Sequence, residues 1–430
     1  MKFLFLSESG DGLGIALRVL EEGNEVAVWI TQSDCQAMGN GLVPKVTDWK
    51  FSIDAETVIV PDVTGFGYVV DALRLGGFYV ACGGSIADRL EGDRKFASEA
   101  MCSCGIKTPR SWTFRSWDKA TDFVNGFKDR LVFKPIGPLS GNVPSSVSYS
   151  QEDMLGLMDR ARRKSYGKPE FELQEFIQGT ELSTEGWFDG HDFLRPFGHN
   201  LERKQLMDND LGPSGGCSGG AVWARPNDCP LLCGMTEFLA SHHYVGSIDI
   251  NAIITEDGEA YGLEFTPRFG YDTTVILFLE LFEGEIGKFL SDLARDQLSG
   301  EMPLGPGFGA GVRITISPYP HPKYEAEPGI AVCGLDGEDF NHFYPYALAL
   351  DEDGELVTSG GESLIGVVTG HGDSVRSAFR KAYKIADKLE IPGKQYRSDL
   401  ADVVRDDLEK LGISEEEIAS GSARQGAEHL

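Results

Sequence analysis

Basic residues are scarce in this chain relative to acidic ones. Its 430 residues include 39 Lys and Arg against 67 Asp and Glu, which gives a formal net charge of −28 at pH 7. Proteins that bind nucleic acids or anionic membrane surfaces generally need a basic surface. The composition therefore argues against a general binder of either kind, and an anionic substrate must be held by a few local Lys, Arg and backbone N–H groups.

Long apolar runs and paired cysteines are also missing. No apolar run reaches the length of about 18 residues that a spanning helix needs, and Phe3–Leu6 is too short for the core of a signal peptide. The eight cysteines are scattered, and the C-x-C of Cys102 and Cys104 has no matching second pair. We therefore expect a cytoplasmic protein with reduced cysteines that acts on small molecules, with no nucleic-acid or membrane partner, as a monomer or small homo-oligomer.

Glycines follow the first apolar run in a pattern typical of a ligand-binding turn. Phe3–Leu6 predicts a strand, and Gly10, Gly12 and Gly14 lie between it and a helical pattern. At a helix N-terminus such glycines let backbone N–H groups approach a ligand. Further strands of a doubly wound domain are predicted at 25–30, 57–62 and 79–82. A tight turn without a ligand is the alternative for the glycines alone.

A charged hairpin is predicted near the middle of the chain. Strands at 247–254 and 260–265 flank a Thr-Glu-Asp-Gly turn. Because side chains alternate along a strand, Glu264 and Thr266 share one face, and Arg268 follows two residues later. A carboxylate, an oxygen ligand and a guanidinium on one side of a sheet suit a magnesium–triphosphate. The alternative is a surface hairpin with solvated charges.

Three other segments have features that suit a nucleotide. Lys134 ends an apolar strand at 131–135 beside a glycine-containing loop, which suits a phosphate, although a lysine stem packed along a strand end is commoner. The strand at 171–177 can offer adenine a backbone donor and acceptor, and Glu181 after it can bind ribose hydroxyls. The glycine-dense stretch 211–220 predicts a loop close to a ligand rather than a plain linker.

Together these segments resemble the ATP-grasp superfamily and, within it, the phosphoribosylamine–glycine ligase family, in the same order over about residues 1–400. Six motifs carry the resemblance: LEGDRKFA is similar to the family's LEGSKAFA, LQEFIQGTE to IEEFLxGEE, DNDLGP to GDTGP, LEFTPRFG to LEFNARFG, GELVTSGG to a TSGG stretch, and QYRSDL to QYRRDI. Each motif alone is loose, but six in the right order are not a chance match.

The resemblance implies an α/β chain with an ATP-grasp fold. Residues 1–100 would form the Rossmann-like N-terminal domain that precedes the ATP-grasp domain of residues 101–305. A small lid subdomain would lie at about 110–175. A strand-rich α+β domain at 306–400 would follow, and 401–430 would be an acidic helical extension with a flexible tail.

The resemblance also implies roles for individual residues, with ATP and Mg²⁺ (or Mn²⁺) as cofactors. The implied ATP contacts are Lys95, Lys134, Glu175, Phe176, Ile177 and Glu181. The implied metal ligands are Glu264, Asn251 and Thr266, and the implied catalytic residues are Arg268 and Lys204. The implied substrate contacts are Gly10, Gly12, Gly14, Asp210, Gly212, Gly215 and Gly216. In the implied reaction ATP phosphorylates a carboxylate, and an amine attacks the acyl phosphate to give an amide, ADP and phosphate.

Departures from the family pattern lie mainly near the acceptor substrate. Thr266 replaces an asparagine ligand, Glu362 replaces an arginine, the first glycine turn lacks the family's Arg-Glu-His, and the loop 139–144 lacks a lysine. We therefore expect either the family reaction, within purine biosynthesis, or a ligase for a different acid and amine. A non-catalytic ATP-binding protein is the main alternative. A Rossmann oxidoreductase has only the Gly10–Gly14 turn in its favour.

Overall fold

The first hundred residues form a parallel sheet covered by helices. The computed structural model describes residues 1–139, 143–165, 168–225, 229–270, 272–298, 300–321 and 326–421. The sheet has the order β2-β1-β3-β4, with β1 (Lys2–Ser7), β2 (Glu25–Ile30), β3 (Thr57–Pro61) and β4 (Tyr79–Val80). Its helices are α1 (Leu13–Glu21), α2 (Gly67–Leu75), α3 (Ser85–Gly92) and α4 (Arg94–Ser103). The predicted strands are confirmed, but β4 is shorter than predicted because the backbone turns away with positive φ from Cys82 to Gly84.

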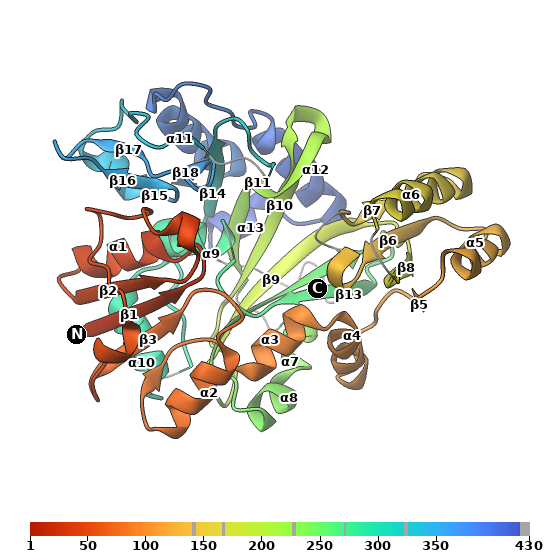
Figure 1. Cartoon of the computed structure of the whole chain (residues 1–430), viewed down its shortest axis with the longest axis horizontal. Helices are drawn as coiled ribbons and strands as arrows, with labels where there is room; N and C mark the ends of the chain where they lie inside the picture. The colour runs from red at the N-terminus through yellow and green to blue at the C-terminus, as the bar shows by residue number, and fades with distance from the viewer. Residues whose placement is uncertain are drawn as a thin grey trace.

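A small antiparallel subdomain projects from the rest of the molecule (Figure 1). Its sheet has the order β5-β8-β6-β7, with β5 (Ser111–Phe114), β6 (Leu131–Pro135), β7 (Ser146–Val147) and β8 (Phe171–Glu175). Helices α5 (Trp117–Gly126) and α6 (Gln151–Lys164) complete it, with a 3-10 turn at Gly137–Leu139. Trp117 and Phe171 stack with ring centroids 4.5 Å apart in its own hydrophobic core.

One eight-stranded antiparallel sheet joins the middle of the chain to its C-terminal part. Its order is β13-β12-β9-β10-β11-β14-β18-β15. The strands are β9 (Thr180–Phe188), β10 (Phe197–Met207), β11 (Leu211–Arg225), β12 (Gly246–Ile254), β13 (Ala260–Thr266), β14 (Phe308–Thr315), β15 (Phe343–Pro345) and β18 (Leu364–Gly372). The predicted hairpin is confirmed as β12 and β13. A domain boundary is predicted at residue 305, between β11 and β14 in the chain. These two strands pair with each other, so the large sheet includes strands from both sides of that position.

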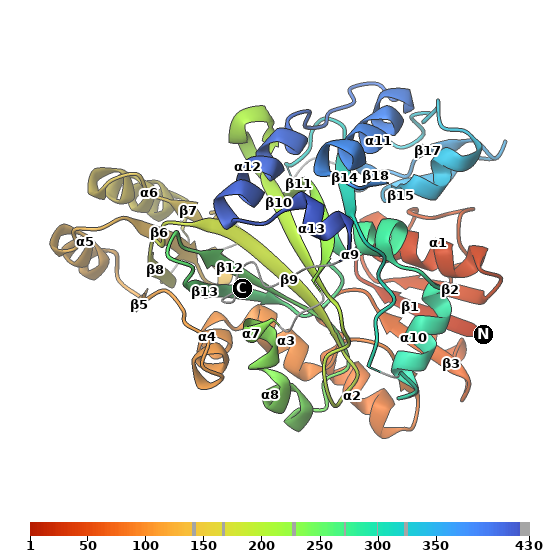
Figure 2. The same ribbon diagram turned by 180° about the vertical axis from the view of Figure 1, so that it is seen from behind.

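Helices and short elements cover the large sheet on both sides (Figures 1 and 2). In the chain, α7 (Pro230–Cys233) and α8 (Thr236–Ser241) lie between β11 and β12. After β13 come α9 (Thr273–Ile276), a π-helical turn (Leu277–Leu281) and α10 (Ile286–Ala294). The C-terminal part adds the two-stranded sheet of β16 (Leu348–Leu350) and β17 (Leu356–Thr358), with α11 (Val375–Lys388). The 3-10 turns are Ser33–Cys35, Trp49–Phe51, Asp208–Asp210 and Gly337–His342. None of the helices in the described ranges is long and apolar enough to cross a membrane.

The predicted acidic extension begins with two helices that pack against the large sheet. Helix α12 (Leu400–Leu411) buries Leu400, Val404 and Leu408 in the same core as β10, β11 and β14, and α13 (Glu415–Ala419) adds Ile418. Figure 2 shows both helices on the side of the sheet that faces the viewer. The predicted flexible tail falls largely on residues 422–430, which lie outside the described residues.

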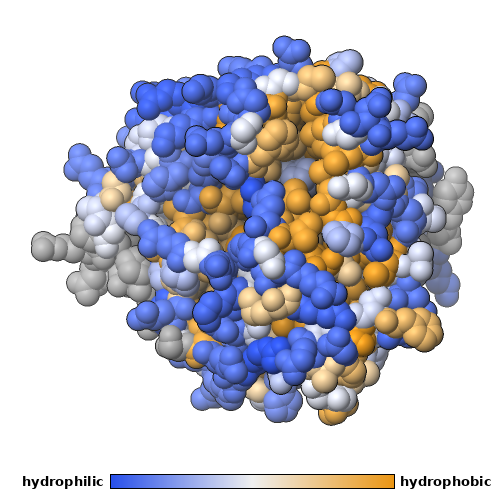
Figure 3. Space-filling model, turned by 90° about the vertical axis from the view of Figure 1, so that its left-hand side faces the viewer, coloured by the Kyte–Doolittle hydropathy of each residue, from blue (hydrophilic) through white to orange (hydrophobic). Residues whose placement is uncertain are grey.

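The face that carries the N-terminal sheet has a mixed surface. Figure 3 shows hydrophobic residues gathered around a hollow near the middle of this face, with hydrophilic residues around them. A small groove between the N-terminal domain and β15 is lined by Leu13, Leu17, Leu42 and Tyr346, among others. The two parts of the chain therefore meet along an apolar seam.

A buried carboxyl connects the large sheet to the helix after β13. The Glu185 side chain accepts hydrogen bonds from Thr274 Oγ1 at 2.7 Å and from Trp187 Nε1 at 2.8 Å, and the residue is 3% exposed. Burial raises the pKa of Glu185 to about 7. The folded chain therefore retains a proton on Glu185 at pH values where the unfolded chain has lost it.

The raised pKa of Glu185 predicts a pH-dependent loss of stability. Between pH 4.5, the ordinary value, and pH 7 the folded state binds more protons than the unfolded state, so the free energy of unfolding falls as pH rises. Glu185→Gln removes this contribution, and the decline between pH 5 and pH 8 should be smaller by about 2.5 kcal/mol. Urea unfolding at both pH values measures the decline. The exposed Glu352→Gln is the matched control, and an equally steep decline in Glu185→Gln would contradict the assignment.

Candidate active site

The hairpin of β12 and β13 places the three predicted metal ligands on one face of the large sheet. Asn251 is directly opposite Glu264, and Asp249 is directly opposite Thr266. Directly opposed residues of an antiparallel pair point to the same side, and residues two apart on one strand do so as well. Glu264 is exposed on this face, whereas Asn251 is buried.

Lys204 and Glu181 meet on the same face beside Asn251. Lys204 Nζ donates to Glu181 Oε1 at 2.5 Å, and Asn251 Nδ2 donates to the same oxygen at 2.6 Å. Burial acts to raise the pKa of Glu181, but the charge of Lys204 and these hydrogen bonds outweigh it and hold the pKa below its usual value. Burial acts to lower the pKa of Lys204. The charges of the surrounding carboxylates, of which Glu181 has the largest effect, outweigh burial and raise this pKa above its usual value. Lys204 is therefore a fixed cation.

Two further carboxyl groups line this face, and sequence reasoning missed both. Burial, opposed by Lys204 and reinforced by Glu181, raises the pKa of Glu202 to about 7. Burial and then the charge of Glu185 raise the pKa of Asp249 to about 7. Strand alternation could have found them, because each stands two residues from a predicted site residue. The face therefore holds more carboxyl groups than its own cations neutralise.

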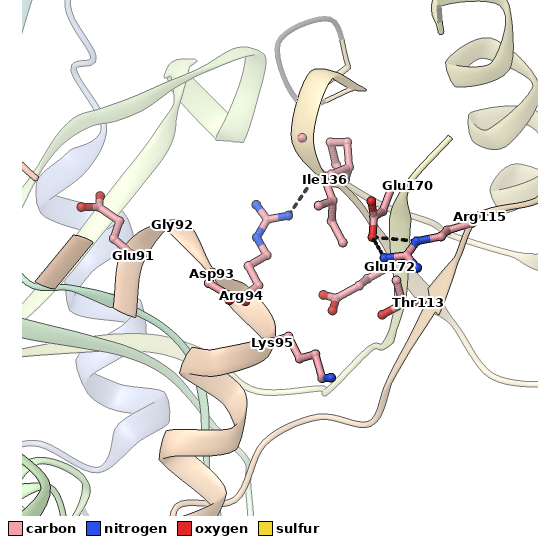
Figure 4. Close-up of a pocket in the computed structure, with 12 residues that line it drawn as sticks. Glu91, Gly92, Asp93, Arg94, Lys95, Thr113, Arg115, Ile136, Glu170 and Glu172 are labelled. Carbon is pink, nitrogen blue, oxygen red and sulfur yellow. Dashed lines mark hydrogen bonds and ion pairs between the residues drawn. The ribbon is translucent and has the colours of Figure 1, made fainter. Parts of the chain in front are cut away.

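A cavity of about 800 Å³ separates the lid subdomain from α3 and α4 (Figure 4). Arg94 reaches across it, and its Nη1 donates to the carbonyl of Pro135 at 2.8 Å. Lys95, the predicted phosphate contact, also lines the cavity, but its side chain is 79% exposed and lies 3.6 Å from Glu99. The charge of Arg94 acts on Lys134, so the structure brings these two cations together. Sequence reasoning missed Arg94, although the adjacent position in the same motif is basic.

Lys134 extends from β6 toward the large sheet. Burial lowers the pKa of Lys134, and the charge of Glu264 opposes that effect, which places the ammonium near the predicted metal ligand. Arg268 lies beyond the end of β13, where its Nε and Nη2 donate to Glu91 Oε1 at 3.2 and 3.1 Å. Glu91 also lines the cavity between α4 and the lid, so Arg268 is tied to the edge of that cavity.

The predicted adenine segment lines a second cavity of about 730 Å³. Arg110 binds the Glu175 carboxylate with two hydrogen bonds of 2.8 Å, and the Arg130 guanidinium lies 3.9 Å from the ring centre of Phe176. The backbone N–H groups of Glu175 and Phe176 donate to carbonyls of these same arginines. Within the described ranges the N–H of Ile177 has no acceptor, so this donor is available to a ligand.

The C-terminal helix α12 contributes to the same cavity. Asp407 and Lys410 line it together with Arg203, Asp210 and Glu181. Arg203 forms an ion pair with Asp407, and Lys410 Nζ lies 2.9 Å from Asp407 Oδ1. No local pattern could have found this contact, because α12 reaches the cavity only through packing of residues about 200 positions apart in the sequence.

The predicted substrate residues lie in two different places. Gly10 and Gly12 lie between β1 and α1, and Gly14 lies in the first turn of α1. Asp210 ends the 3-10 turn between β10 and β11, whereas Gly212, Gly215 and Gly216 lie in β11, so the loop predicted at 211–220 is a strand. Two arginines hold this segment: Arg397, which is fully buried, donates to Asp210 Oδ1 at 2.8 Å, and Arg313 Nη1 donates to the carbonyl of Gly215 at 3.2 Å. Residues 140–142 of the lysine-free loop, and Tyr271, lie outside the described residues.

Comparisons with known proteins show which proteins this chain is similar to. Residues 92–274 match the family model described as phosphoribosylglycinamide synthetase, ATP-grasp (A) domain. A phosphoribosylamine–glycine ligase of Neisseria meningitidis serogroup B is 25% identical over 435 residues, which cover 94% of this chain and 99% of the relative. The enzyme of the same name from Leifsonia xyli is 28% identical over 368 residues, which cover 80% of this chain and 83% of the relative.

Solved structures show the same fold. The phosphoribosylamine–glycine ligase of Thermotoga maritima superposes with a TM-score of 0.71 at 23% identity, covering 93% of this chain and 100% of that one. A biotin carboxylase of Campylobacter jejuni, in a beta-gamma-ATP complex, superposes with a TM-score of 0.61 at 13% identity and covers 92% of each chain. The chain has an ATP-grasp fold, and over most of its length it is similar to phosphoribosylamine–glycine ligases.

Proposed function

We propose that this protein is an ATP-dependent carboxylate–amine ligase that forms an amide through an acyl phosphate and releases ADP and phosphate. The observation that carries the proposal is the cluster of Lys204, Glu181, Asn251 and Glu264, which faces Lys134 of the lid beside the adenine cavity. The relatives that bear the name phosphoribosylamine–glycine ligase support this reaction class. With the same substrates, the reaction would belong to purine biosynthesis.

The adenine cavity can orient a nucleotide at its base and ribose. The N–H of Ile177 is a backbone donor for adenine, and Phe176 beside it contributes an aromatic wall. Glu181, Asp407 and Lys410 lie on the polar side of the cavity, where ribose hydroxyls can be bound. A nucleotide held in this way would extend its phosphates toward Lys134.

The residues present fit a magnesium ion that is shared with a nucleotide. Glu264 and Asn251 offer oxygen ligands, and Asn251 Oδ1 is buried without a hydrogen-bond partner in the described ranges. Across the described ranges, no group of three or more His, Cys, Asp or Glu side chains could hold a metal ion. Magnesium commonly takes one or two carboxylates and completes its shell with phosphates and water. When bound, the ion would supply neutralisation of the charge on the transferring phosphoryl group.

The chain's own cations position and neutralise the reacting groups. Lys134 approaches from the lid and Arg94 from α4, and Lys204 is fixed on the sheet by Glu181. Arg268 is held at the cavity edge by Glu91 and is the residue we assign to the charge that develops during transfer. Such preorganised charges need no reorganisation at the moment of reaction, which is the main protein contribution to phosphoryl transfer.

The proposed metal site predicts the effect of replacing Glu264. Its side chain is exposed in the cleft and serves no core contact, so Glu264→Gln should fold normally and lose at least about 100-fold of Mg-ATP-dependent ADP release. The measurement is coupled ADP release with glycine and phosphoribosylamine, followed by a panel of other acids and amines. Glu259→Gln, on the turn side of the same hairpin, is the matched control. Full ADP release by Glu264→Gln would exclude the metal assignment, and ATP binding without turnover by the natural protein would favour a non-catalytic role.

The proposed nucleotide cavity gives a further prediction for the C-terminal helix α12. Lys410→Ala removes a cation from the nucleotide cavity, so the Kd for ATP should rise about five-fold, the effect of losing one modest polar contact, while kcat at saturating ATP stays within about two-fold. Titration calorimetry and steady-state kinetics measure the two quantities. The exposed Lys381→Ala on α11 should change neither. An unchanged Kd in Lys410→Ala would show that α12 does not contact the nucleotide.

A further inference from the structure

Three aspartates follow the carboxyl ends of parallel strands in the N-terminal sheet. Asp11 follows β1, Asp34 follows β2 and Asp62 directly follows β3. In open α/β sheets, ligands bind in the crevice outside the carboxyl ends of the strands. The edge that would receive a substrate in such a sheet is therefore acidic in this chain.

The N-terminus of α1 is already occupied by one of these carboxylates. The backbone N–H of Gly12 donates to Asp62 Oδ2 at 2.6 Å, and the N–H of Leu13 donates to the carbonyl of Gly10. The two segments are so close that a Cβ at Gly12 would lie 2.7 Å from Asp62 Oδ2. Exposed N–H groups at this place would normally attract phosphate. Here the chain's own carboxylate takes that position.

A fourth carboxylate comes from the C-terminal part of the chain. Gly361 packs on the backbone of Asp34, where a Cβ would lie 2.6 Å from the Asp34 carbonyl oxygen. The next residue, Glu362, has a raised pKa because of desolvation and then the charges of Asp11 and Asp34. Asp11, Asp34, Asp62 and Glu362 are called the carboxylate cluster below.

One oxygen of the carboxylate cluster points to a missing hydrogen-bond donor. Asp62 is fully buried, and its Oδ1 has no hydrogen-bond partner in the described part of the chain. Buried polar atoms in folded proteins nearly always have a partner. Burial and then the charge of Asp11 raise the pKa of Asp62 to about 8, so this carboxyl also lacks a compensating positive charge. A cationic ligand with N–H donors would stabilise the ionised form and bond to Oδ1, whereas a fully ionised phosphate offers neither a positive charge nor a donor.

The carboxylate cluster is connected to the proposed phosphoryl-transfer face. Arg313 of β14 acts electrostatically on Glu362, and its guanidinium is held by Asp272 with hydrogen bonds of 2.6 to 3.2 Å. Asp272 in turn acts on Glu202, two residues from Lys204. Arg313, the basic residue that acts on Glu362, is thus already paired with Asp272.

We propose that the carboxylate cluster binds the acceptor substrate of the ligase, and that this acceptor is a cationic amine without a phosphate group. The inference rests on the proposed ligase function and specifies its acceptor class. A phosphorylated acceptor would meet acidic side chains in the loops after β1, β2 and β3, whereas a protonated amine gains both opposite charge and donors for Asp62. Discrimination here comes as much from repulsion of phosphate as from attraction of the amine.

Binding measurements test the charge preference without any turnover. The probes are 1,4-diaminobutane and ribose 5-phosphate, titrated by calorimetry into the full-length protein. We expect the diamine to bind at least about ten-fold more tightly than the sugar phosphate, and Glu362→Arg to weaken the diamine by about ten-fold or more. Glu362 is exposed, so the variant should fold, and the exposed Glu352→Arg is the matched control. Equal or tighter binding of ribose 5-phosphate, or no binding of either probe, would overturn the proposal.

Turnover separates this inference from the ligase function itself. Ribosylamine and its 5-phosphate form in the assay from ammonia with ribose or ribose 5-phosphate, and glycine and Mg-ATP complete each mixture. We expect faster ADP release with the unphosphorylated amine and a shift toward the phosphorylated one in Glu362→Arg. Preference for the phosphorylated amine in the natural protein would overturn the acceptor class and leave the ligase function standing. Diamine binding without ADP release for any acceptor would overturn the ligase function and leave cation binding standing.

Discussion

The ion pair of Lys204 with Glu181 is the interaction on which the candidate site depends. It joins β10 to β9, and Asn251 ties β12 to the same carboxylate oxygen. Around it, burial has already raised the pKa values of Glu202 and Asp249, so the face has little capacity for another uncompensated charge. Removing one partner of such a partly buried pair leaves an unpaired charge in a poorly solvated place, which is far more costly than the net value of the pair.

The proposed site has two ends of opposite charge. Lys134 and Arg94 approach the nucleotide end from the lid and α4, whereas Asp11, Asp62 and Glu362 lie at the other end, near the N-terminus of α1. The buried pair of Arg313 and Asp272 lies between them, and Arg313 also binds the carbonyl of Gly215 in β11. This arrangement supports a ligase that neutralises phosphate where ATP binds and excludes phosphate where the acceptor binds. It also gives a physical meaning to the departures from the family pattern at Glu362 and in the first glycine turn.

Strand alternation predicted that Glu264 and Thr266 share one face of the proposed nucleotide site. It did not predict their partners, because the register set by the turn would place Leu263 opposite Asn251. A register shift between Asn251 and Ala252 instead pairs Asn251 with Glu264 and Asp249 with Thr266. Strand alternation cannot predict the direction of side chains at the start of a helix. Arg94 and Lys95 are neighbours in one motif, but the direction in which the first turn of α4 presents each side chain decides which of them reaches Pro135 and which faces Glu99. A local pattern cannot distinguish these two directions, because both positions are polar and lie near a helix end.

The sequence by itself determined the parallel N-terminal strands, the β12–β13 hairpin, the strand that ends at Glu175 and the resemblance that leads to the fold. These features depend on local periodicity, turn chemistry and motif order, all of which are written along the chain. Only the tertiary structure decided that Asp62 takes the N–H of Gly12, that Glu362 lies against Asp34, and that Lys410 lines the nucleotide cavity. Each of these contacts joins segments far apart in sequence, and their partners are selected by packing of whole elements rather than by any pattern in the neighbouring residues.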